Sequence, residues 1–76
     1  MSDMFFQVYF DQERVQFLGR NGTFAAKGME LRENDGVVEF TPITSRGKLA
    51  SCFIQIPIAD LPFVINALTR IVEESK

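Results

Sequence analysis

The chain of 76 residues carries eight basic and ten acidic side chains, a balance that creates no overall field favouring nucleic acid or an anionic membrane. It holds no His and a single Cys, which excludes an internal disulfide and removes the commonest general base and metal ligand. Its length suits one domain over residues 1–76, but 46% hydrophobic residues and eight Phe are more than so small a core can hide, so we expect a homodimer.

The N-terminal residues 1–6 lack the basic start and the long apolar run of a signal peptide. Nowhere does the chain approach the roughly 20 consecutive apolar residues of a membrane span. Together with the single Cys, these features predict a reduced, cytoplasmic protein that does not enter a membrane.

The first part of the chain predicts two strands and a hairpin turn. Residues 4–10 are dense in β-formers and predict the first strand, whereas the polar residues 11–14 predict a break whose limits the sequence leaves open. The strand pattern resumes over residues 15–18. It ends before Asn21-Gly22, and Asn-Gly is the strongest short hairpin signal because both residues tolerate positive φ.

The middle of the chain predicts a second hairpin, with its turn at residues 34–36. Residues 23–32 precede this turn as a strand, in which Gly28 marks a bulge or a close approach of another backbone. Residues 37–44 follow it as the next strand. Because Pro42 has no N–H to donate, that strand is expected to lie at an edge of the sheet or to be bulged there.

A third turn at residues 45–48 leads to a last strand over 49–58 and then to the helix of this chain. Asp60 is a suitable N-cap, Pro62 fits the first helical turn, and the helical pattern ends near Glu74. One apolar stripe runs along this helix, made of Leu61, Val64, Ile65, Leu68, Ile71 and Val72. We therefore predict an α+β fold, in which an antiparallel sheet of four to five strands is followed by one C-terminal helix packed across it.

The sequence offers little from which to build a catalytic or metal site. Glu30 and Glu39 fall on neighbouring strands and form a candidate acid/base pair, but no nucleophile motif accompanies them. A cross-strand ion pair of Glu39 with Lys27 or Arg32 is the plainer expectation. Cys52 lies in an apolar strand, which favours an inert buried thiol over a nucleophile. We expect no enzymatic activity, no cofactor and no metal.

Positive charge is concentrated in the third turn, where hydroxyls flank Arg46 and Lys48 around Gly47. Such a turn holds phosphate oxygens through side-chain and backbone N–H donors, although a solvated hairpin tip has the same composition. Further cations lie in the sheet half, and cations that share a face with aromatic rings suit single-stranded nucleic acid. The candidate nucleic-acid-binding residues are Arg46, Lys48, Ser45, Lys27, Arg32, Arg20 and Tyr9.

The order of strands, turns and helix from residues 23 to 74 resembles a group of small single-stranded nucleic-acid-binding domains: the Whirly family, the Pur family and the transcriptional positive-cofactor family. The Whirly family carries a Lys-Gly-Lys-Ala-Ala-Leu motif, and residues 46–51, Arg-Gly-Lys-Leu-Ala-Ser, resemble it in the cation, Gly, cation and Ala positions. The resemblance implies pairing through helices and sheets, binding of unpaired strands on the sheet, and backbone contacts from Arg46 and Lys48.

Two functions from different classes remain open. The first is a non-enzymatic, homodimeric module that binds single-stranded nucleic acid on the sheet face and on the Arg46–Ser51 segment. The alternative is a protein-interaction or structural subunit that presents an exposed apolar sheet surface at the first strand or at the strand of Pro42. The sequence does not separate them, because a dimer interface and a stacking platform draw on the same aromatic residues.

Overall fold

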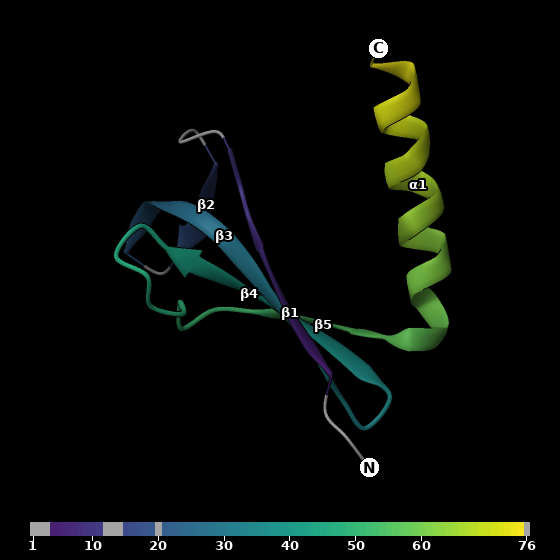
Figure 1. Cartoon of the computed structure of the whole chain (residues 1–76), viewed down its shortest axis with the longest axis horizontal. Coiled ribbons are helices and arrows are strands. Elements are labelled where there is room, and N and C mark those ends of the chain that lie inside the picture. Colours follow the sequence, from purple (N-terminus) through teal and green to yellow (C-terminus); the bar gives the residue numbers. More distant parts are fainter. Residues whose placement is uncertain (1–3, 12–14, 20, 76) are drawn as a thin grey trace.

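The computed structural model describes residues 4–11, 15–19 and 21–75, and Figure 1 shows them as a twisted antiparallel sheet followed by one helix. The strand β3 is the spine of this sheet, because it pairs with β1, β2 and β4, and β5 then pairs with β4. The α+β class and the antiparallel sheet are confirmed. The elements are β1 (Phe5–Tyr9), β2 (Gln16–Gly19), β3 (Gly22–Asn34), β4 (Val37–Thr44), β5 (Ile54–Pro57), the 3₁₀ turn η1 (Ile58–Asp60) and α1 (Leu61–Glu74).

Glycine and aspartate residues with positive φ form the hairpin turns where the sequence predicts them. Asp35 and Gly36 join β3 to β4 and have φ values of 56° and 84°, as a two-residue hairpin loop with positive φ at both positions requires. Gly19 pairs with Gly22 across the turn between β2 and β3, and Gly22 has a φ of 130°. The predicted break at residues 11–14 falls mostly outside the described residues.

Gly28 allows β1 to approach β3 closely. The register of β3 against β4 shifts between Ala26 and Gly28, which is the predicted bulge. A Cβ added to Gly28 would lie 2.5 Å from the carbonyl oxygen of Val8, a backbone atom, and 3.1 Å from Cδ1 of Tyr9. The residue therefore has to be Gly for β1 to pair at this distance.

The register divides the sheet into two unlike faces, since side chains alternate along each strand. One row across the sheet is Gln7, Glu30 and Thr41, and it belongs to what we call the polar face. The other side, which we call the apolar face, presents Phe6, Val8, Met29, Leu31, Val38, Phe40, Pro42, Ile54 and Ile56.

The predicted packing of the helix across the sheet is wrong for the single chain. α1 has the predicted bounds and the predicted apolar stripe, but it stands away from the strands in Figure 1 and has its main contacts with η1. None of its residues is buried, and Ile65, Leu68, Ile71 and Val72 are each more than half exposed. Helical periodicity specifies which side of a helix is apolar, but it does not specify which surface covers that side.

Two smaller expectations also differ from the structure. The last strand is only Ile54–Pro57, and Leu49 makes an isolated bridge to Ile43. Asp60 stands at the N-cap position with helical φ and ψ of −93° and −12°, and its side chain makes no capping hydrogen bond. It does not cap α1 because η1 runs directly into the helix, whereas a capping residue has extended backbone geometry.

Among the described residues very few side chains are buried. Ala26 and Ile43 are the buried hydrophobic residues, and Glu30 and Thr41 on the polar face are the buried polar ones. The apolar face and the apolar stripe of α1 therefore both remain uncovered within one chain. With 14 residues, α1 is too short to cross the hydrocarbon core of a bilayer, and no helix of the described residues does so.

Candidate functional site

The polar face is organised around Glu30, a buried residue that is 6% exposed. Gln7 Nε2 donates to Glu30 Oε1 at 3.1 Å, and the Arg32 guanidinium lies 3.5 Å from Oε2. The predicted ion pair between Arg32 and Glu39 is wrong, although the two residues are register partners. Arg32 pairs with Glu30 instead. The Glu39 carboxylate accepts a hydrogen bond from Gln55. With the carboxylates of Glu30 and Glu39 and the one guanidinium of Arg32, this face carries a net negative charge.

Three predicted binding cations gather at the opposite end of the sheet from the β3–β4 turn. Arg46 and Lys48 lie in the exposed tip that follows β4, and Ser45 begins this tip. The chain turns there because Gly47 has a φ of 86° and its N–H donates to the carbonyl of Thr44. Lys27 extends from β3 against the same tip: its Nζ lies 3.4 Å from the position of a Cβ built on Gly47. We call Lys27, Arg46 and Lys48 the basic end.

The remaining predicted residues lie apart from the basic end or outside the description. Arg32 stands over the ring of Phe5, with 5.0 Å from its Cζ to the ring centroid, at the far end of β3. Tyr9 packs beside Gly28 and donates its hydroxyl hydrogen to Gln7 Oε1. Arg20 is outside the described residues. Ion pairs within the described part of the chain involve Arg32 and Arg70, and none involves the basic end.

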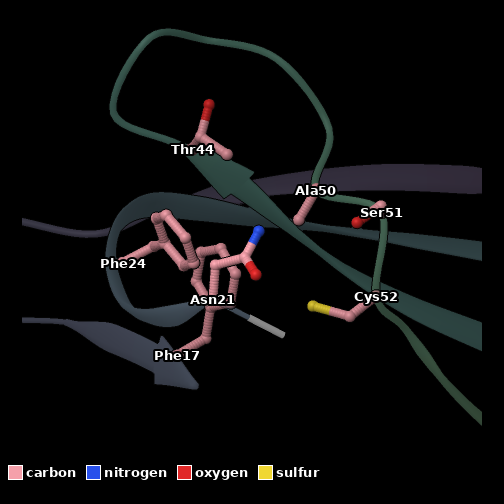
Figure 2. Close-up of a pocket in the computed structure, with 7 residues that line it drawn as sticks. All are labelled: Phe17, Asn21, Phe24, Thr44, Ala50, Ser51 and Cys52. Carbon is pink, nitrogen blue, oxygen red and sulfur yellow. The ribbon is translucent and has the colours of Figure 1, made fainter. Parts of the chain in front are cut away.

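A hollow of about 710 Å³ lies beside the basic end, between the β2–β3 hairpin and the segment after β4. Thr44 joins the two features: it lines the hollow, and its Oγ1 accepts a hydrogen bond from the N–H of Lys48 at 3.3 Å. Figure 2 shows the Asn21 amide and the Cys52 sulfur directed into the hollow, with the rings of Phe17 and Phe24 forming one wall. The lining residues are Phe17, Asn21, Phe24, Thr44, Ala50, Ser51 and Cys52.

The aromatic wall is held by strand pairing. Phe17 of β2 and Phe24 of β3 are register partners, and their rings stack with centroids 5.7 Å apart. Phe24 keeps 43% of its surface exposed, so the pair is not a closed core. An exposed aromatic surface beside cations is the combination that binds unpaired bases through stacking and backbone phosphates through charge.

The sequence predicts the basic tip and, in general terms, cations that share a face with aromatic rings, but it does not identify Asn21 or Cys52 as part of a site. The sequence predicts Asn21 only as a turn residue and Cys52 as a buried thiol within a strand. The structure places Cys52 in the irregular segment before β5, half-buried, with its sulfur facing the hollow. The Asn-Gly hairpin signal was the available clue, since a tight turn directs its residues toward one end of the sheet.

Among the described residues, no three His, Cys, Asp or Glu side chains are grouped so that they could hold a metal ion. Glu30 and Glu39 lie on the same face but have separate partners, Gln7 and Arg32 for the first and Gln55 for the second. The described carboxylates of this face are therefore engaged in structural hydrogen bonds and an ion pair.

The uncovered apolar surfaces form a second candidate site. Phe6 and Ile54 on the apolar face are each 64% exposed, and they belong to one row across β1, β3, β4 and β5. The stripe of α1 adds four more apolar side chains that are over half exposed. Contiguous apolar surface of this kind marks contact with another protein surface.

The chain was compared with models of protein families, with curated proteins and with solved structures. No family model matches it, and no curated protein or solved structure matches it.

Proposed function

We propose that the chain is a non-enzymatic, homodimeric module that binds single-stranded nucleic acid. The observation that carries the proposal is the gathering of Lys27 with the Arg46–Lys48 tip beside the exposed aromatic pair Phe17 and Phe24. Cations at this end attract backbone phosphates, and the rings offer stacking surface to bases. An unpaired strand fits this arrangement better than a duplex, because the bases of a duplex are already stacked on each other.

Binding is centred on the basic end and not on the polar face. The polar face carries Glu30 and Glu39 against Arg32, and Arg32 is already paired with Glu30. Carboxylates on that face repel phosphates, whereas the Ser45–Lys48 tip contains two cations and no acidic residue. The sequence predicts that the strand binds across the sheet face; we now propose that it binds at one end of the sheet.

The homodimer is proposed from the apolar stripe of α1 and the apolar face of the sheet. In one chain the stripe residues Ile65, Leu68, Ile71 and Val72 are exposed to solvent, as are Phe6 and Ile54. A second copy supplies both kinds of surface at once, so that each copy covers the other by the same contacts. Dimerisation also places two basic ends on one particle, which raises the avidity for a strand long enough to reach both.

Fluorescence anisotropy of a labelled single-stranded oligonucleotide tests the nucleic-acid part. We expect binding at low salt that weakens as salt rises, with a slope of about −0.7 in log affinity against log salt for each phosphate contact. Lys48→Ala should weaken binding and make this slope shallower by about one contact. Arg70→Ala is the matched control, because it removes an equal charge from an exposed helical position where Arg70 pairs with Glu74 at 3.7 Å.

Two outcomes would contradict the proposal. One is no detectable binding of single strands at low salt. The other is an equal loss of affinity in Lys48→Ala and Arg70→Ala, because that would mean that net charge alone attracts the strand.

The second candidate function is a protein-interaction subunit. The exposed apolar row containing Phe6 and Ile54 favours it independently of the basic end. In that case the chain self-associates or binds another protein, and single strands do not bind. Light scattering over a range of concentrations, together with the anisotropy assay, separates the two functions. The nucleic-acid-binding module requires both self-association and binding of single strands, whereas the protein-interaction subunit does not bind single strands.

A further inference from the structure

The hollow beside the basic end has the size and lining of a site for a small planar ligand. Its volume of about 710 Å³ falls inside the range of roughly 300–1,000 Å³ that is usual for small-molecule sites. Its walls come from two parts of the chain that are distant in sequence: Phe17, Asn21 and Phe24 of the β2–β3 hairpin, and Thr44 with residues 50–52 after it. The bulk of its apolar wall is the Phe17–Phe24 pair, with Ala50 opposite.

The polar groups of the hollow are suited to the edge of a nucleobase. The Asn21 amide presents two donor hydrogens and one acceptor oxygen, and Figure 2 shows it directed into the space beside the rings. No hydrogen bond within residues 21–75 occupies that amide. The Ser51 hydroxyl and the Cys52 thiol add further polar atoms to the lining. A planar group that stacks on Phe24 therefore meets a hydrogen-bonding side chain at its edge.

The position of the hollow also connects it to the phosphate-binding tip. Thr44 lines the hollow, and the same residue holds the tip through hydrogen bonds with Gly47 and Lys48. The tip that carries Arg46 and Lys48 therefore starts at the rim of the hollow, on the side where the sugar–phosphate of a bound base could leave it. The geometry matches one nucleotide, with an aromatic part inside and an anionic part at the rim.

We propose that this hollow takes one unpaired base of the bound strand, stacked against Phe24 and hydrogen-bonded at its edge by Asn21. The inference rests on the proposed nucleic-acid function and deepens it, because it gives the module a position at which base identity matters. The remaining nucleotides are held by phosphate contacts, which carry no sequence information.

Cys52 provides a direct reporter, because it is the single Cys of the chain and its sulfur faces the hollow. The rate of its alkylation by iodoacetamide is measured for the protein alone and in the presence of a saturating uniform strand of deoxythymidine, deoxyadenosine or deoxycytidine. We expect alkylation to slow in proportion to the bound fraction. Unchanged alkylation in a saturated complex would overturn the base site and leave the proposed function standing.

Asn21→Ala tests base selection, with Asn34→Ala as the matched control at the other hairpin. Both residues are exposed and lie next to a hairpin turn, so each substitution removes one side-chain amide from a comparable position. We expect Asn21→Ala to change the ratio of affinities among the three uniform strands by roughly fivefold or more, and Asn34→Ala to leave it unchanged. An unchanged ratio in Asn21→Ala would contradict the inference, and failure of every strand to bind at low salt would overturn it together with the proposed function.

Discussion

Leu68 in the middle of the α1 stripe provides the sharpest test of the homodimer. It is 55% exposed in the single chain, so burial against a second copy recovers about half of the 1.5–3 kcal/mol that full burial of a Leu contributes, or about 1 kcal/mol. A symmetric dimer contains this contact twice. We therefore expect Leu68→Ala to weaken dimerisation by about 2 kcal/mol, which is roughly a 30-fold rise in Kd.

Sedimentation over a range of protein concentrations measures this change in Kd. Asn66→Ala is the control, because Asn66 is exposed on the same helix but outside the apolar stripe, and we expect it to leave Kd unchanged. A protein that remains monomeric at every concentration would refute the reasoning. Equal shifts in Leu68→Ala and Asn66→Ala would also refute it, because the stripe would then have no special part in association.

Three further substitutions test the fold and the site. Gly28→Ala should lower the free energy of unfolding by about 1–3 kcal/mol in denaturant titrations, because the added Cβ meets the Val8 carbonyl oxygen. An unchanged unfolding midpoint would show that β1 moves freely. Asp60→Ala should change stability by less than about 0.5 kcal/mol, because no capping bond is lost, and a loss of about 1 kcal/mol would mean that Asp60 does cap the helix in solution. Glu30→Ala should cost about 1–3 kcal/mol by the same titration, since it removes the partner of Arg32 and Gln7 at a buried position, and a neutral result would show that the polar face is not held by this network.

Local chemistry explains which parts of the fold the sequence could predict. The turn at Asp35-Gly36 follows from positive φ values that few other residues adopt, and Gly28 leaves room for the close approach of the Val8 backbone at the bulge, so single residues determine both features. The bounds of α1 follow from Pro62 near its start and from the periodic apolar stripe. These features depend on neighbours close in sequence.

The rest depends on partners distant in sequence. The last strand is shorter than its β-forming residues suggest, because the pairing of β4 with β5 ends at Phe40 and Ile54. If this pairing continued by two residues, Pro42 would lie opposite Cys52, and Pro42 has no N–H to donate. The segment instead turns, and Ala50 donates to the carbonyl of Pro42. Cys52 thereby leaves the predicted strand and lines the hollow. The position of the helix also depends on a distant partner. An apolar stripe shows which side of a helix is apolar but does not determine which surface covers that side.

The central position of β3 has a consequence for the order in which the chain acquires its structure. Its two hairpins, with β2 before it and β4 after it, close over tight turns, and such local pairings form within about 1–10 μs. β1 and α1 have no such local partner on β3, so the three-stranded meander can assemble first. In the proposed homodimer, attachment of the helix to a second copy would come last, and the rate of that step would depend on the protein concentration.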